Sequence, residues 1–513
     1  MTIGSESSVS CSPGSSIAHQ RVVDQLRAIT IPLANYLKNW IQQQQKLGSR
    51  TFYGEAFSLA FLSQQRMLSD AERQQLIDLY FKHDFSDPQF HWEFNQYALR
   101  NYLKTSTEDR IKQHLAQARY KGTPCANWSL LRFNTQLLAG ENATIILQDT
   151  HRVLKTSQVP SGLILDEPHV RSFQYHCFSL AMLAEIYEQT GDMACYRSFI
   201  KGVNFILPFI LRDGNTLYVG RGQEQSFGYS SLIYCLATAY SWTSCATYLD
   251  KLEQVASYLK SFQKSDGSLP LVLNRVEAID AQRPLDLMSP SYAGWYGYNN
   301  YFDYLPFTGF FLGKSINQLA TTPQCLTKES PVYNAYQNGD YVVVKQENYD
   351  AVLAKPGGAW SNDLAMPYIR YKGKPITPCY GGEQGVHSLY HKIDLPLPLI
   401  LSCNKLIRNM SFVSFSSNCL RIISPLGYMQ RRFHFEASSI HTTSSVRTPF
   451  RFFHQFLFFS EVHQISPYSF DGPGYWITAN RPLEYSREAY CALGPLKVYT
   501  SSSSKIEVNI HLK

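Results

Sequence analysis

One short stretch of the chain holds two neighbouring side chains that can transfer protons. Residues 171–177, RSFQYHC, place Tyr175 beside His176 where a helical pattern begins. A phenol and an imidazole both serve enzymes as general acids or bases. Adjacent residues of an α-helix point about 100° apart, so each side chain has to be judged separately. His176 borders the apolar stripe of its helix, which fits a catalytic base and a half-buried structural histidine equally well.

A second candidate stretch, CANWSLLRF, begins at Cys125. Asn127 precedes an apolar helical pattern, so its side chain either caps that helix or binds a ligand. Arg132, one turn later, is either a solvated charge or a ligand for an anion. Residue type alone leaves both alternatives open.

A third stretch, LRDGNTLYVGRGQEQSFGYSS, is a polar loop that runs into a helix. Its glycines do not complete a dinucleotide-binding fingerprint, and no Gly-Lys-Ser/Thr follows, so nucleotide binding is not indicated. The glycines instead favour sharp turns of the backbone. Such turns are predicted to place Arg221 and Tyr229 at a surface.

These three stretches lie in a region of helical periodicity that extends from residue 18 to residue 325. Apolar residues recur at i, i+3, i+4 and i+7 in about ten segments, which follow one another in pairs. We find no fixed-period repeat of the tetratricopeptide or ankyrin kind, so an α/α toroid, or incomplete helical barrel, is predicted in preference to an open solenoid. Residues 1–17 are polar and Ser-rich and are predicted to form a disordered tail.

After residue 325 the pattern changes to that of strands. Short runs such as DYVVVKQ and FRFFHQFLFFSEV are rich in β-branched and aromatic residues and are separated by Gly, Pro, Asn and Ser. Residues 335–513 are therefore predicted to form an antiparallel β-sandwich, with the boundary near 322–335. The predicted fold is α+β with two domains, as expected for a chain of 513 residues.

Composition excludes several classes of protein. Charged residues make up only 17% of the sequence and aromatic residues 14%, which argues against a disordered chain. The net charge of +7 is spread along the chain without a nucleic-acid-binding motif, so it indicates at most an anionic ligand. The eleven cysteines form no C-x-x-C pair, so neither a zinc site nor a disulfide framework is predicted. With no membrane span and no signal-peptide core, a cytoplasmic protein is the default expectation, although export by another route stays open.

Taken together, the three stretches resemble motifs of the heparinase II/III family of polysaccharide lyases and its alginate lyase relatives. That family carries an Asn-Trp motif and, further along, a Ser-x-x-Tyr-His motif on a helix. Here Asn127-Trp128 is followed by SFQYH at residues 172–176. The family also joins an α/α toroid to a C-terminal β-sandwich, the domain order predicted above, so the resemblance covers nearly the whole chain.

The resemblance implies β-elimination on a polysaccharide that contains uronic acid. The carboxylate of a uronate must be neutralised before a base can remove the proton on C5. By analogy, Asn127 would hydrogen-bond this carboxylate, and Tyr175 would protonate the leaving glycosidic oxygen or remove the proton, with a histidine as its partner. Trp128, Arg132 and Arg221 would bind substrate, the arginines through their planar guanidinium groups.

The resemblance also implies a second histidine at the start of the strand domain, within a Gly-His-x-His-x-Asp segment. The corresponding segment of this chain, GGAWSND at residues 357–363, contains no histidine. His176 and Tyr229 are the candidate replacements for the base. Trp360 and Asn362 of the same segment are predicted substrate ligands.

The leading hypothesis is a polysaccharide lyase that binds an anionic polysaccharide or oligosaccharide, with no cofactor, metal, nucleic acid or membrane as partner. One alternative is a glycoside hydrolase on the same toroid, and another is a non-catalytic glycan-binding or polysaccharide-assembly protein that has lost its base. The sequence does not indicate the oligomeric state. The carboxylates that could form the catalytic pair of a hydrolase include Asp166, Glu185, Asp213 and Glu224.

Overall fold

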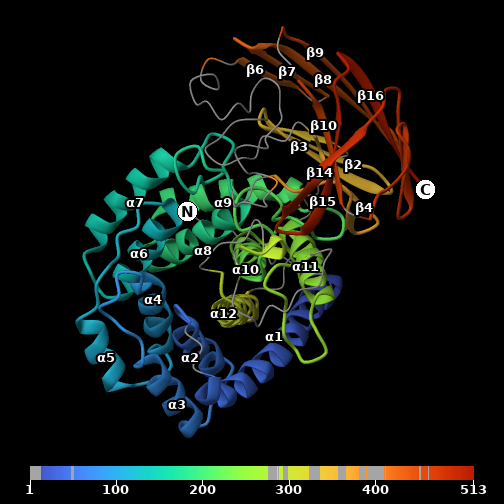
Figure 1. The fold of residues 1–513 in the computed structure, drawn as a ribbon. Coiled ribbons are helices and arrows are strands. Elements are labelled where there is room, and N and C mark those ends of the chain that lie inside the picture. The colour runs from blue at the N-terminus through green and yellow to red at the C-terminus, as the bar shows by residue number, and fades with distance from the viewer. Residues whose placement is uncertain are drawn as a thin grey trace.

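The chain forms helices first and antiparallel strands afterwards, which confirms the order predicted from the sequence (Figure 1). The computed structural model describes residues 13–47, 51–274, 286, 288–292, 299–322, 335–355, 366–380, 389, 410, 412–416, 418–449, 452–459 and 461–513. The helices are α1 (Pro13–Leu47), α2 (Gly54–Gln64), α3 (Asp70–Tyr80), α4 (Trp92–Tyr102), α5 (Asp109–Ala116), α6 (Ala126–Leu138), α7 (Ala143–Ser157), α8 (Phe173–Thr190), α9 (Met193–Ile206), α10 (Ser226–Thr243), α11 (Ala246–Ser261) and α12 (Tyr301–Ala320), with short 3-10 turns η1 (Leu207–Phe209) and η2 (Pro290–Tyr292).

Two of the predicted boundaries can be compared with these elements. Helix α1 begins at Pro13, so residues 13–17 of the predicted tail are helical, while residues 1–12 lie outside the described part of the chain. Proline suits the first turn of a helix because an amide hydrogen at that position would have no carbonyl partner. Helix α12 ends at Ala320 and strand β1 begins at Ala335, on either side of the predicted domain boundary, and residues 323–334 lie outside the described residues.

Six helices contact one another in a closed order: α2, α4, α6, α8, α10, α12 and then α2 again. Helices α1, α3, α7, α9 and α11 each pack against members of this ring. Helix α8 buries every residue from Phe173 to Ile186, as expected for a helix that is enclosed on all sides. Helix α7 buries only the stripe of Ile146, Thr150 and Leu154, which is typical of a helix that covers the outside of a core.

Within the described part of the chain, the strands form three antiparallel sheets (Figure 1). The orders are β1-β2-β3-β4-β5, β10-β15-β14 and β11-β12-β13-β16-β9-β8-β7-β6. Alternating burial along β9 and β16 shows that the large sheet packs one face inward and turns the other to water. The strands are β1 (Ala335–Gln337), β2 (Tyr341–Lys345), β3 (Tyr349–Ala354), β4 (Tyr368–Tyr371), β5 (Lys374–Pro375), β6 (Phe412–Ser416), β7 (Cys419–Ser424), β8 (Gly427–Phe435), β9 (Ser439–Arg447), β10 (His454–Phe459), β11 (His463–Ser466), β12 (Ser469–Gly472), β13 (Tyr475–Ala479), β14 (Glu484–Cys491), β15 (Gly494–Ser501) and β16 (Lys505–Leu512).

The five-stranded sheet shares one hydrophobic core with the helices. The ring of Tyr341 lies 5.1 Å from that of Phe209, and Tyr218 stacks on Tyr368 at 4.7 Å between ring centroids. Tyr380 also pairs through its backbone with the loop before α10. Its amide donates to the carbonyl of Tyr218 at 3.0 Å, and its carbonyl accepts from the amide of Gly220 at 2.7 Å. The strand half therefore holds this loop in place.

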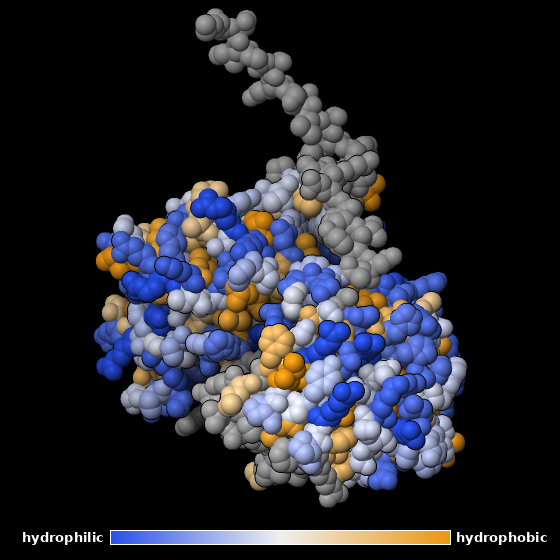
Figure 2. All heavy atoms as spheres, turned by 90° about the horizontal axis from the view of Figure 1, so that it is seen from above, coloured by the Kyte–Doolittle hydropathy of each residue, from blue (hydrophilic) through white to orange (hydrophobic). Residues whose placement is uncertain are grey.

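Among the described helices, none combines the length and the apolar character that crossing a membrane requires. On the face drawn in Figure 2, apolar side chains are scattered among hydrophilic ones.

A buried ion pair links four helices of the ring. Glu185 of α8 pairs with Lys314 of α12 and accepts hydrogen bonds from Tyr97 of α4 at 2.6 Å and from Asn134 of α6 at 2.8 Å. Burial acts to raise the pKa of Glu185, but Lys314 and the hydrogen bonds outweigh it and lower the pKa below its ordinary value. The carboxylate is thus charged in the folded chain and depends on Lys314 for compensation.

We expect Lys314→Met to destabilise the chain by about 3–5 kcal/mol, because it leaves the Glu185 carboxylate buried without a cation. Combining it with Glu185→Gln should recover most of the loss, since the charge is then absent as well. The free energy of unfolding in urea measures both effects. Arg73→Met is the control, because Arg73 and Asp70 form an exposed pair that should contribute at most about 1 kcal/mol. Equal losses for the two single variants would contradict the buried-charge explanation.

Candidate functional site

A cavity of about 100 Å³ lies at the N-terminal ends of the ring helices. Every helix of the ring contributes to it at or near its first turn, either directly or through the residue that precedes the helix. Apart from Arg221, its walls are formed by aromatic rings, one of which is the imidazole of His91. The lining residues are Tyr53, His91, Phe94, Trp128, Tyr175, Phe178, Arg221, Phe227 and Tyr304.

Tyr175 and Arg221 form the polar centre of the cavity. The guanidinium carbon of Arg221 lies 4.9 Å from the centroid of the Tyr175 ring, a cation–π arrangement. The hydroxyl of Ser172 accepts from the amide of Tyr175 at 3.4 Å and donates to the carbonyl of Arg221 at 3.0 Å. The cap of α8 thus positions both residues, and the two sequence-predicted residues do come together.

The turn that presents Arg221 requires glycine at position 220. Gly220 has φ +89°, and a side chain there would meet the carbonyl oxygen of Arg171 at 2.0 Å. The guanidinium group of Arg221, of which 15% is exposed, pairs with the carboxylate of Asp166 at 3.1 Å and lies 4.0 Å from that of Glu167. Arg221 therefore enters the cavity in a fixed direction.

Asn127 is tied to the same carboxylate. Its side-chain amide donates to Asp166, and its buried Oδ1 has no hydrogen-bond partner among the described residues. Burial raises the pKa of Asp166 to about 6, although Arg221 and Asn127 both act to lower it. The alternative of an N-cap does not hold for Asn127, because Cys125 occupies the cap position and Asn127 is the second helical residue.

The cavity also contains a histidine that the sequence did not single out. His91 immediately precedes α4, and its ring stacks on Phe52 at 4.7 Å and meets Trp128 edge to face at 5.2 Å. Burial, helped by the positive charge of Lys121, lowers the pKa of His91 to about 3, so its imidazole is neutral at physiological pH. The Nδ1 atom is buried and has no hydrogen-bond partner among the described residues. The neutral imidazole thus offers a ring nitrogen that can accept a proton, while burial opposes the charge that this would create.

His176 belongs to the core of the helical part. Its Nδ1 accepts from the amide of Ile164 at 3.0 Å, and its Nε2 lies 3.0 Å from the carbonyl oxygen of Gly202, to which it donates. Burial lowers the pKa of this imidazole to about 4. With both nitrogens occupied by the backbone, the structure favours the structural alternative for His176 over a role as base.

Tyr229 lies in a second buried network outside the cavity lining. Its hydroxyl accepts from the amides of Thr216 at 3.0 Å and Leu217 at 3.3 Å and donates to Glu224 at 2.9 Å. Glu224 also accepts from Tyr258 at 2.9 Å. Burial raises the pKa of Glu224 to about 7, even though Arg370 acts to lower it. These contacts assign Tyr229 to the support of the loop and not to proton transfer in the cavity.

The remaining predicted ligands fall into three groups. Trp128 lines the cavity. Arg132 is absent from the lining, lies 3.9 Å from Glu93 and packs its guanidinium carbon 5.5 Å from the ring centroid of Phe133. Trp360 and Asn362 lie outside the described residues.

Comparison with known proteins gives similarity at the level of solved structures only. No family model and no curated protein matches the chain. The chain is similar to a chondroitin AC lyase of Streptomyces coelicolor A3 in complex with chondroitin sulphate, with 10% identity over 99% of this chain and 81% of that chain and a TM-score of 0.49. It is also similar to the cellobiose 2-epimerase of Spirochaeta thermophila DSM 6192 (12% identity, 60% and 98% of the chains, TM-score 0.43) and to a heparinase III (10%, 87% and 78%, TM-score 0.33). We therefore base the functional proposal on the cavity itself.

The raised pKa of Glu224 leads to a prediction about stability. Since the folded pKa of about 7 exceeds the ordinary value of 4.5, the protonated carboxyl stabilises the fold fully below pH 4.5, and this contribution, about 3 kcal/mol at most, is lost as the pH rises through 7. We expect Glu224→Gln to reduce the fall in unfolding free energy between about pH 5 and pH 8. Urea denaturation across this range measures it. Parallel curves for the two proteins would show that Glu224 does not titrate in this way.

Proposed function

We propose that the chain is a polysaccharide lyase that cleaves a uronic-acid-containing polysaccharide by β-elimination. In this proposal the ring of helices corresponds to the α/α toroid that the resemblance implies. The sheets correspond to its β-sandwich. The observation that carries it is the cavity, which Tyr175, His91 and Arg221 line together, with the Nδ1 atom of His91 left without a hydrogen-bond partner among the described residues.

Several features of the cavity favour a carboxylate as part of the substrate. Helix N-termini carry partial positive charge and exposed amides. In three of the ring helices, α4, α6 and α10, the side chain of the N-cap residue makes no capping hydrogen bond, whereas at α2 the carboxylate of Asp303 accepts from the amide of Tyr53. Arg221 adds a guanidinium group, which is paired with the carboxylate of Asp166, and the amide of Asn127 donates to the same carboxylate. Such a set would withdraw charge from a uronate carboxylate and so acidify its C5 proton.

In this proposal His91 acts as the general base and Tyr175 as the general acid. His91 is neutral and can take the C5 proton on Nδ1, which leaves the electron pair of the broken C–H bond to form the double bond between C4 and C5. As the bond from C4 to the glycosidic oxygen breaks, Tyr175 gives its hydroxyl proton to that oxygen. Exchange with water then returns the proton to Tyr175 and removes it from His91. His91, from the helical part, thereby takes the role of the histidine that segment 357–363 lacks.

The aromatic walls suit the rest of a sugar ring. Trp128, Phe227 and Tyr304 present flat apolar faces, which pack against the C–H groups of a pyranose and exclude water from the reacting atoms. Exclusion of water strengthens the electrostatic effect of Arg221 on the carboxylate.

Hydrolysis is the second candidate, and one observation favours it. The pKa of Asp166, at about 6, would let this carboxyl act as a general acid near neutral pH. However, Asp166 already accepts from Asn127 and pairs with Arg221, so a role in positioning explains its location better.

We expect the purified chain to release products with ultraviolet absorbance from at least one of alginate, heparan sulfate, chondroitin, hyaluronan and glucuronan, because elimination creates a conjugated double bond. Tyr175→Phe and His91→Ala should each lower kcat/KM by about 10²–10⁴-fold. Tyr196→Phe and His434→Ala are matched controls, since Tyr196 and His434 lie outside the cavity lining and should leave the rate unchanged. Circular dichroism establishes that each variant is folded.

The outcomes separate the hypotheses. New reducing ends without ultraviolet absorbance would establish hydrolysis and overturn the proposed elimination. Binding without either signal would instead favour a non-catalytic glycan-binding protein. Loss of activity in the control variants to the same degree would remove the assignment of Tyr175 and His91.

The positive charge of Arg221 can be tested separately. Replacing Arg221 by Gln removes the positive charge next to the substrate carboxylate and should lower kcat/KM by about 10²–10³-fold. Arg132→Gln should change the rate little, because Arg132 does not line the cavity. Steady-state kinetics on the best substrate of the panel measures both. A larger loss for Arg132→Gln would show that substrate binds elsewhere.

A further inference from the structure

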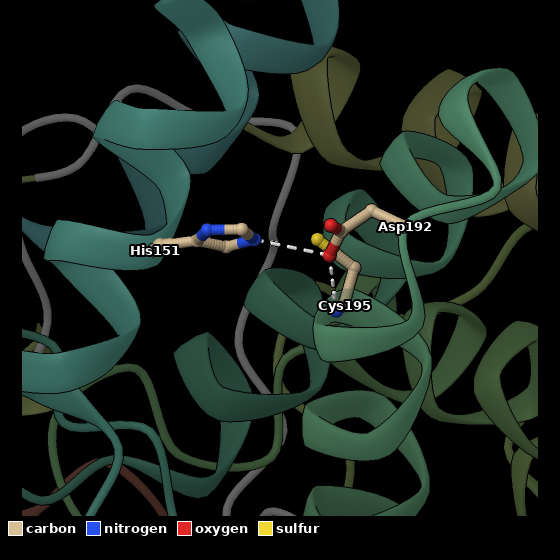
Figure 3. A group of neighbouring side chains, drawn as sticks. All are labelled: His151, Asp192 and Cys195. Carbon is tan, nitrogen blue, oxygen red and sulfur yellow. Dashed lines mark hydrogen bonds and ion pairs between the residues drawn. The ribbon is translucent and has the colours of Figure 1, made fainter. Parts of the chain in front are cut away.

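A second group of chemically active side chains lies outside the cavity, between α7 and α9. His151 comes from α7, Asp192 is the N-cap of α9, and Cys195 lies in the first turn of α9 (Figure 3). Each offers one ligand atom, and these three atoms all lie within 4.8 Å of one another. No step of the proposed elimination uses them.

The three side chains converge from two helices. The imidazole of His151 points from α7 toward the carboxylate of Asp192, with Nε2 at 3.0 Å from Oδ1, and the sulfur of Cys195 lies next to that carboxylate (Figure 3). The side chain of His151 is 43% exposed and that of Asp192 19%, whereas Cys195 is fully buried. The group is therefore accessible to solvent at His151, whereas the thiol of Cys195 lies on its buried side.

Capping of α9 does not require this composition. Asp192 accepts from the amide of Cys195 at 2.8 Å, which satisfies the start of the helix. Asn142 does the same for α7 with bonds to the amides of Thr144 and Ile145, and it needs neither an imidazole nor a thiol. The cap of α9 therefore does not explain why His151 and Cys195 are present.

The donor set suits a zinc ion. Imidazole nitrogen, carboxylate oxygen and thiolate sulfur are the ligands of zinc, which binds them at about 2.0–2.3 Å in a tetrahedron, so that the ligand atoms lie roughly 3–4 Å apart. The observed limit of 4.8 Å accommodates this spacing with small side-chain movements. A carboxylate and a thiolate together also balance the two positive charges of the ion, which favours binding at a half-buried position.

We propose that His151, Asp192 and Cys195 bind a zinc ion, with water as the fourth ligand. On binding, the thiol of Cys195 loses its proton to solvent, and Nε2 of His151 turns its lone pair to the metal while the ring proton resides on Nδ1. The ion joins α7 to α9. The absence of C-x-x-C pairs argued against zinc from the sequence, but this set needs only one cysteine.

Cobalt(II) provides the direct test, because it takes the same ligands as zinc and is coloured. The full-length chain is treated with a chelator, dialysed and titrated with cobalt chloride. We expect near-ultraviolet absorption from a cobalt–thiolate bond, visible bands of tetrahedral intensity, and loss of both when one equivalent of zinc is added. Absence of the thiolate band in the folded wild-type chain would overturn the proposal without any variant.

Variants then assign the ligands. Cys195→Ser should abolish the thiolate band, and His151→Ala should weaken zinc binding by at least about tenfold. His441→Ala is the matched control, because His441 and Glu436 form a partly exposed histidine–carboxylate pair, 3.2 Å apart, with no cysteine in the group. Retention of the band in Cys195→Ser would place the metal on another thiol and overturn the assignment. Zinc should raise the melting temperature of the wild type and not that of Cys195→Ser, and a cooperative melting transition in each protein shows that both are folded.

Discussion

The closed order of the six ring helices is the constraint on which the site depends. Closure brings the beginnings of all six helices to one place, and the residues at these beginnings line the cavity. Because the N-cap side chains of α4, α6 and α10 make no capping hydrogen bond, the N-terminal ends of these helices contribute partial positive charge to a space that is otherwise walled by aromatic rings. The aromatic lining gives this pocket a low polarity, and the helix ends add partial positive charge to it.

The strand half completes this pocket by fixing the loop that carries Arg221. Backbone bonds join that loop to Tyr380, and Arg370 of β4 pairs with Asp213 at the start of the loop. At the same junction, the buried carboxyl group of Glu224 accepts hydrogen bonds from the hydroxyls of Tyr229 and Tyr258. A loop with several glycines would lose this geometry if it were not held on both sides. The two halves are therefore one unit with respect to the site, although the second half contributes no residue to the described cavity lining.

The features that could be predicted from the sequence are those encoded locally. Hydrophobic period distinguishes helices from strands over a few residues, so the order of the two halves was predictable, and the Asn-Trp and Tyr-His motifs marked Trp128 and Tyr175. The proposed base was not predictable, because His91 and Tyr175 line one cavity only through closure of the ring, and a single histidine before a helix carries no signal of that arrangement. For His176 the sequence could not choose between its alternatives, since both backbone partners come from segments remote in sequence.

Burial of Arg221 explains why Asp166 has to be present. A guanidinium group that is only slightly exposed among aromatic rings would be costly to hold without a counter-charge, and Asp166 supplies it. The carboxylate would itself be costly to bury, which is why its pKa is raised despite the arginine. The amide of Asn127 provides the additional hydrogen bond that such a pair needs. Three residues far apart in the sequence thus form one electrostatic unit, and any change to one of them alters the charge that Tyr175 and His91 experience.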